Sequence, residues 1–145
     1  IAPRAGLKVM YSAWAQLVSE AMVRRTRFDP LHQAATEEQL YDRLPGWLQA
    51  LRAAESLDVT VDTDGGSFGA TMRREQFSFA AEAWYAQIAE LLRAGHRADE
   101  PTTLVLSSRA ALLPMFGERL SALPGIELQS LSDTAGAESA AARAD

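Results

Sequence analysis

The spacing of apolar residues changes along the chain, and this change constrains the fold more than any other feature. Apolar residues recur every three or four positions from Leu7 to Met22, which predicts a helix that ends near Phe28. Between Leu57 and Met72 the spacing becomes two, which predicts a β-hairpin turning at Asp64-Gly65-Gly66. Helical spacing then returns. A chain with this order must combine helices with strands.

Two further helices are predicted on either side of the hairpin. Thr36-Glu37-Glu38-Gln39 has the form of a capping box, so a second helix is expected to begin there. Pro45-Gly46 is expected to kink that helix or to split it into two pieces. The apolar stripe from Phe77 to Leu92 predicts one long third helix. Trp14 and Trp84 lie within helical stripes, so both are expected to be mostly buried.

The last third of the chain has a βαβ-like order. Leu104-Val105-Leu106 is short and apolar without alternation, as expected of a strand buried on both faces. A helix beginning near Leu112 and running to Leu123 follows, and then a second strand at Ile126-Glu127-Leu128. Ser132-Asp133 can cap a final alanine-rich helix.

These elements place the chain in the α/β class, in its α+β form. We expect long helices and a β-hairpin packed beside a short sheet with a βαβ-like C-terminal part. Residues 1–145 form a single domain or fragment, with a helical and hairpin subdomain at 7–98 and a strand–helix–strand–helix part at 101–145. Because the chain begins without methionine and opens almost directly into helix periodicity, a fragment of a longer protein is expected.

The composition excludes several classes of function. With no cysteine, the chain has no disulfide, thiolate nucleophile or cysteine metal site, and a cytoplasmic origin is favoured. A net charge of -5 argues against nucleic acid as a partner, and no apolar stretch has the length of a membrane span. Arg24, Arg25 and Arg27 form a basic cluster that complements the negative end of a helix, so no function is assigned to it.

Several strings in the second half of the chain follow an order that is found in one protein family. Ser67-Phe68 is followed by Met72-Arg73-Arg74-Glu75-Gln76-Phe77, in which Arg74 and Phe77 match a Thr-Arg-x-x-Phe segment that opens a long helix. This passage resembles the second lobe of the ATPase domain in the seventy-kilodalton heat-shock chaperone family, within the actin-like superfamily. The resemblance covers nearly the whole chain.

The resemblance continues toward the C-terminus. Leu104-Val105-Leu106 is similar to the strand that precedes the family's phosphate-binding turn, and Pro114 is similar to the proline of that turn. Asp133 and Ala135 resemble the aspartate and alanine of an Asn-Pro-Asp-Glu-Ala string. The resemblance implies that the parent protein binds ATP and magnesium. It implies candidate nucleotide-binding residues, which are Ser107, Ser108, Arg109 and Asp133.

The sequence departs from the family at the positions that would contact ATP. The two glycines of the phosphate turn align with Ser108 and Arg109, whose side chains would obstruct a close approach of backbone to phosphate. The family's Glu-x-x-Lys-Arg-x-x-Ser string, which grips adenosine, falls within residues 45–53, and Pro45-Gly46-Trp47-Leu48-Gln49 does not supply its charges. The resemblance therefore implies an altered ATP cleft.

Two interpretations of Ser107-Ser108-Arg109 remain open from the sequence. The three residues could form an anion-binding turn at the start of a helix, where free backbone N–H groups attract negative charge. Alternatively, the serines cap the helix and Arg109 is solvated. His32 and His96 lie in polar surroundings without paired acidic ligands, so no metal site and no catalytic residues are predicted.

Two functions follow from these observations. The first is a fragment of a chaperone-like nucleotide-binding domain with an altered ATP cleft, no cofactor and no independent enzyme activity, and its partner would be the remainder of the ATPase domain. The alternative is a protein-interaction or regulatory module on the same scaffold, which contacts another protein through its helical residues 7–55. Fold resemblance does not decide between them, because sites and folds are separable.

Overall fold

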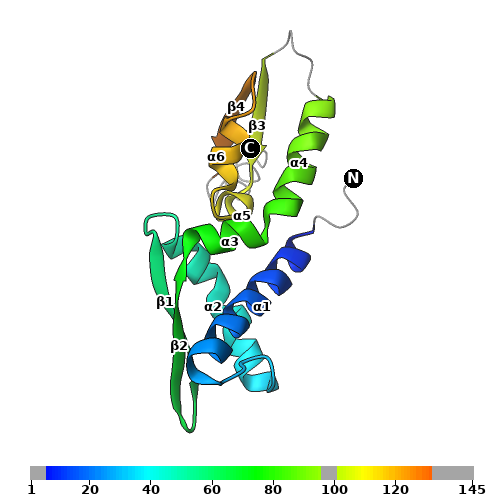
Figure 1. Ribbon diagram of the computed structural model, residues 1–145. Coiled ribbons are helices and arrows are strands. Elements are labelled where there is room, and N and C mark those ends of the chain that lie inside the picture. Colours follow the sequence, from blue (N-terminus) through cyan, green and yellow to red (C-terminus); the bar gives the residue numbers. More distant parts are fainter. Residues whose placement is uncertain (1–5, 96–100, 132–145) are drawn as a thin grey trace, which may run out of the picture.

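A computed structural model describes residues 6–95 and 101–131 of the chain (Figure 1). Within these ranges the fold combines six helices with two small sheets, which confirms the predicted mixed α+β class. In chain order the elements are α1 (Leu7–Thr26), α2 (Ala34–Ala50), β1 (Ser56–Thr63), β2 (Gly66–Arg73), α3 (Arg74–Ala80), α4 (Glu82–Gly95), β3 (Thr102–Leu106), α5 (Ser108–Ala111), α6 (Phe116–Ser121) and β4 (Ile126–Ser130).

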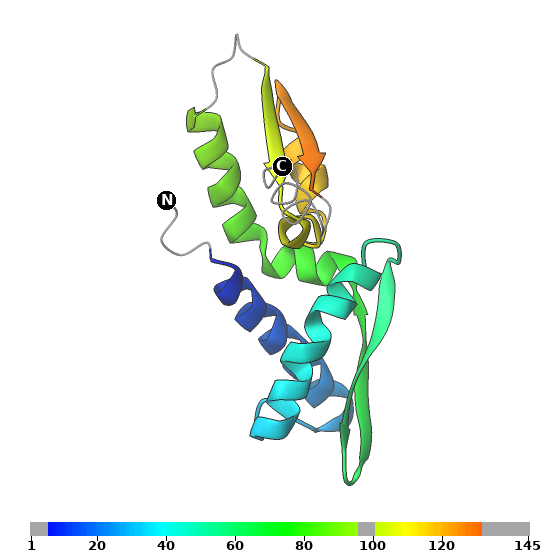
Figure 2. The ribbon, with the colours of Figure 1, turned by 180° about the vertical axis from the view of Figure 1, so that it is seen from behind.

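The hairpin of β1 and β2 carries α1 and α2 on one face, as Figure 2 shows from behind. Its antiparallel register pairs Val59 with Ala70 and closes at Thr63 and Gly66. Val59 and Ala70 are buried, whereas Asp58 between the inward-facing residues is exposed. The alternating apolar and polar residues therefore face the core and the solvent in turn, and the predicted hairpin is confirmed.

The second helix begins earlier than predicted, and of the two alternatives predicted at Pro45, a kink or a split, the split is excluded. It begins at Ala34, and the Thr36 hydroxyl does not cap it but donates to the carbonyl oxygens of Pro30 and Gln33 at 2.7 and 3.0 Å. The helix also continues through Pro45 instead of splitting. Three buried leucines on one face, Leu40, Leu44 and Leu48, hold it against the core, and this packing outweighs the proline's cost of about 3 kcal/mol.

The predicted third helix is in fact two helices. The chain breaks at Ala81 between α3 and α4, where the Ala81 N–H donates to the carbonyl oxygens of Phe77 and Ser78. The break turns Phe77 toward α1, while Tyr85 of α4 packs on Phe116 of α6 with ring centroids 4.9 Å apart. Tyr85 takes the buried position on α4. Its neighbour Trp84 has intermediate exposure and packs against the core, so it is mostly buried, as predicted, but less completely than Tyr85.

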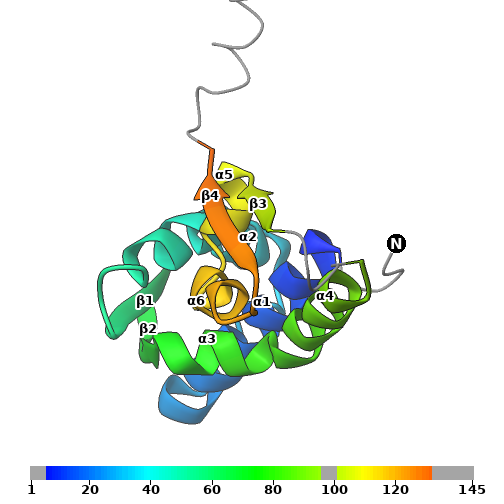
Figure 3. The same cartoon turned by 90° about the horizontal axis from the view of Figure 1, so that it is seen from above.

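The C-terminal part has the predicted βαβ order, with β3 and β4 parallel and α5 and α6 between them (Figures 1 and 3). Two details differ from the expectation. Val105 is 50% exposed, so β3 is not buried on both faces within the described part of the chain. The connecting helix begins at Ser108, not near Leu112, and it is divided into two short helices because Met115 adopts a left-handed conformation with φ of 58°.

Helix α4 joins the βαβ part to the rest of the molecule (Figure 1). It packs against α6, and Glu82 on α4 forms an ion pair with Arg119 on α6. The alanine-rich helix predicted after Asp133 lies outside the described residues. Within those residues, no helix combines the length and the apolar character that a membrane span requires.

Trp14 occupies the centre of the core, where α1 meets α3. Its indole is fully buried and donates a hydrogen bond from Nε1 to the carbonyl oxygen of Phe77 at 2.8 Å. Its ring also contacts Tyr11 and Phe77, with centroids 5.8 and 6.4 Å away. The predicted burial of Trp14 is confirmed.

We expect Trp14→Ala to lower the free energy of unfolding by about 3 to 5 kcal/mol, because it opens a cavity and leaves the Phe77 carbonyl unpaired. Trp84→Ala is the matched control and should cost less than half as much, since Trp84 is only partly buried. Urea denaturation measures both. Equal losses would contradict the assignment of Trp14 to the centre of the core.

The continuity of α2 gives a second test at Gly46, in the interior of the helix. No atom lies within 4 Å of an added Cβ there, so Gly46→Ala should raise the free energy of unfolding by about 0.5 to 1 kcal/mol. Gly69→Ala should lower it, because its Cβ would lie 2.6 Å from the carbonyl oxygen of Val59. If thermal melts showed that Gly46→Ala destabilises the protein, α2 would not run through this position.

Candidate functional site

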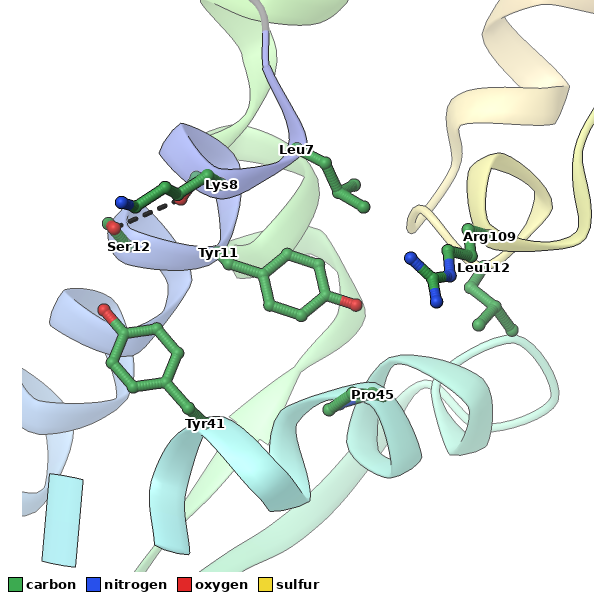
Figure 4. Close-up of a pocket in the computed structure, with 8 residues that line it drawn as sticks. All are labelled: Leu7, Lys8, Tyr11, Ser12, Tyr41, Pro45, Arg109 and Leu112. Atoms are coloured by element: carbon green, nitrogen blue, oxygen red, sulfur yellow. Dashed lines mark hydrogen bonds between the residues drawn. The ribbon is translucent and has the colours of Figure 1, made fainter. Parts of the chain in front are cut away.

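A pocket of about 610 Å³ lies where α1, α2 and α5 approach one another (Figure 4). Three segments that are far apart in the sequence form its walls. They contribute Leu7, Lys8, Tyr11 and Ser12 from α1, Tyr41 and Pro45 from α2, and Arg109 and Leu112 from α5 and its C-terminal end. The pocket thus spans the boundary between the helical part and the βαβ part.

The structure does not bring the four predicted site residues together in this pocket. Arg109 lines the pocket. Ser107 caps α5, since its Oγ accepts a hydrogen bond from the Ala110 N–H at 3.3 Å, so the capping interpretation holds for this serine. Ser108 is the first residue of α5, and neither serine lines the pocket. Asp133 lies outside the described residues.

Arg109 points its guanidinium into the pocket, whereas the amino group of Lys8 points away from Arg109 (Figure 4). Lys8 and Arg109 are both exposed, and within residues 6–95 and 101–131 neither forms an ion pair with a carboxylate. They come from opposite sides of the pocket, Lys8 from the first turn of α1 and Arg109 from α5. The described lining residues include no acid, so the electrostatic potential of the pocket favours an anion.

Tyr11 is the polar group nearest to the middle of the pocket. Its side chain is half-buried, and its hydroxyl points across the pocket toward the guanidinium of Arg109 (Figure 4). Burial raises the pKa of the Tyr11 phenol, and the positive charge of Arg109 offsets part of this rise. Tyr11 is therefore a neutral phenol at physiological pH and can donate a hydrogen bond.

Sequence reasoning missed most of this pocket. Tyr11 was placed on the apolar stripe of the first helix, and that stripe does describe its packing against Trp14. Tyr41 and Lys8 carried no recognisable motif. Two lining residues, Pro45 and Arg109, lie in segments that the sequence had indicated.

A second cavity, of about 300 Å³, lies at the carboxyl ends of β3 and β4, where an open α/β sheet usually places its ligand. Arg52 and Arg74 line it together with Glu118. Because an acid lies beside the two arginines, this cavity does not select an anion as the larger pocket does. No group of three or more His, Asp or Glu side chains is arranged to hold a metal ion in the described part of the chain.

No protein-family model matches the chain, and a search of curated proteins finds no significant match.

The electrostatic effect of Arg109 on the pKa of Tyr11 can be measured by titration. Arg109→Gln should raise the pKa of Tyr11 further, because it removes the positive charge that stabilises the phenolate. NMR of protein labelled at the tyrosine ε carbons follows the titration, with Tyr11→Phe used to assign the signal. Arg93→Gln, which removes a cation on α4, is the control and should leave the pKa of Tyr11 unchanged. An unaltered titration in Arg109→Gln would show that the two side chains do not face each other.

Proposed function

We propose that the chain is a lobe of a chaperone-like ATPase domain of the actin-like superfamily, with an altered nucleotide cleft and no enzyme activity of its own. One observation carries the proposal. Pro45 on α2 and Arg109 on α5 lie on the walls of one pocket, and they belong to the two segments for which the resemblance implies contacts with adenosine and phosphate.

The chemistry of the pocket supports an altered cleft. By the resemblance, Arg109 aligns with a glycine of the phosphate turn, and a side chain at this position would obstruct a close approach of backbone to phosphate. Ser107 already pairs with the Ala110 N–H, one of the donors at the start of α5. The described lining residues provide two cations and no carboxylate, a donor set that does not fit magnesium, which binds oxygen ligands.

The exposed sheet supports the remainder of the ATPase domain as a partner. Strands β3 and β4 form a parallel pair, and parallel sheets are normally covered on both faces. Val105 on β3 and Leu131 after β4 are 50% and 49% exposed in the described chain. We propose that strands and helices of the parent protein cover these residues. The absence of cysteine favours a cytoplasmic location for that protein.

One observation favours the alternative function, a protein-interaction or regulatory module. Phe79 on α3 is 81% exposed, and Val9 on α1 is 44% exposed. Large apolar side chains left on helices are typical of surfaces that contact another protein. This role is compatible with an altered cleft, because it does not require ATP.

Titration with Mg-ATP tests the proposal. We expect a dissociation constant no tighter than about 1 mM, which corresponds to about 4 kcal/mol, because both the phosphate turn and the adenosine segment are altered. Isothermal calorimetry measures the binding, and a parallel assay should detect no phosphate release above background. A dissociation constant in the low micromolar range, or sustained release of phosphate, would overturn the altered-cleft proposal.

A further inference from the structure

We propose that the pocket between α1, α2 and α5 binds a small planar aromatic carboxylate. The inference rests on the proposed function, because it assigns a ligand to the same altered cleft. Three properties of the pocket carry it: its size, its flat apolar walls, and a pair of donors at one side.

The size and the walls of the pocket suit an aromatic ring system. Its volume of about 610 Å³ falls within the range of small-molecule sites. Leu7, Pro45 and Leu112 supply apolar surface, and the rings of Tyr11 and Tyr41 supply flat faces. Aromatic rings gain from offset or edge-to-face contacts with such faces. A flexible or strongly polar ligand would use these walls less well.

The donors at one side suit a carboxylate. The guanidinium of Arg109 presents a fork of N–H groups that matches the two oxygens of a carboxylate, and no carboxylate of the described chain occupies it. The Tyr11 hydroxyl points toward the same place and can donate a further hydrogen bond. Lys8 lines the pocket, but its amino group points away from this place (Figure 4). One strong anion contact is therefore available, beside an otherwise apolar pocket.

Naphthoate is a suitable probe, and naphthalenemethanol is its neutral analogue with the same ring system. We expect the wild-type chain to bind naphthoate about tenfold more tightly than the alcohol, because hydrogen bonds to a charged group are the stronger ones. Arg109→Gln should remove most of this preference, because Arg109 supplies the charged fork of donors. Tyr11→Phe should reduce the preference in part. Calorimetry or NMR titration of the full chain measures the affinities.

Arg93→Gln is the matched control, since Arg93 is an exposed arginine on α4 whose partner, Glu90, lies on the same helix. It should bind both probes as the wild type does. Urea melts should show that the variants remain folded, because Arg109 and Arg93 are exposed. Equal affinity of the wild type for both probes would overturn the inference, as would a naphthoate affinity that Arg109→Gln leaves unchanged.

The two proposals fail in different experiments. Low-micromolar binding of Mg-ATP would overturn the altered cleft, whereas a preference for naphthoate that depends on Arg109 would still support a carboxylate site. Conversely, a chain that binds Mg-ATP no tighter than about 1 mM and shows no preference for naphthoate would keep the proposed function and lose this inference.

Discussion

The indole N–H of Trp14 donates to the carbonyl oxygen of Phe77 across 2.8 Å, in a region that excludes water. A hydrogen bond of this kind has a defined length and direction, unlike the apolar contacts around it. It sets the position of α1 relative to α3, and α3 leads through Ala81 into α4, which carries the βαβ part. The distance between the start of α1 and α5, and therefore the width of the pocket, depends on this contact.

The parts of the fold that the sequence predicted are those in which side chains alternate between core and solvent with a fixed period. The first helix ends at Thr26, close to the expected Phe28, because Asp29-Pro30 does not continue a helix. The hairpin was predicted because apolar residues alternate with polar ones. This alternation matches burial along β2, where Ala70 and Met72 are buried and Thr71 between them is exposed. In each case a local pattern and the global fold agree.

The errors arose where tertiary packing overrides a local signal. Pro45 indicates a break in α2, but buried leucines hold the helix together. The apolar stripe of residues 77–92 indicates one helix, but the chain bends at Ala81, so that Phe77 packs on Trp14 while Tyr85 packs on Phe116 at another point of the same core. For the same reason, the sequence did not predict most of the pocket. Arg109 was identified from the sequence, whereas Tyr11 faces it only because α1 and α5 meet in three dimensions.

Tyr11 belongs to the helical part of the molecule and Arg109 to the βαβ part. A ligand held by both side chains contacts α1 and α5 at once, so it binds only when the helical part and the βαβ part are correctly placed. Any ligand that binds this arrangement stabilises it by an amount set by its concentration and affinity.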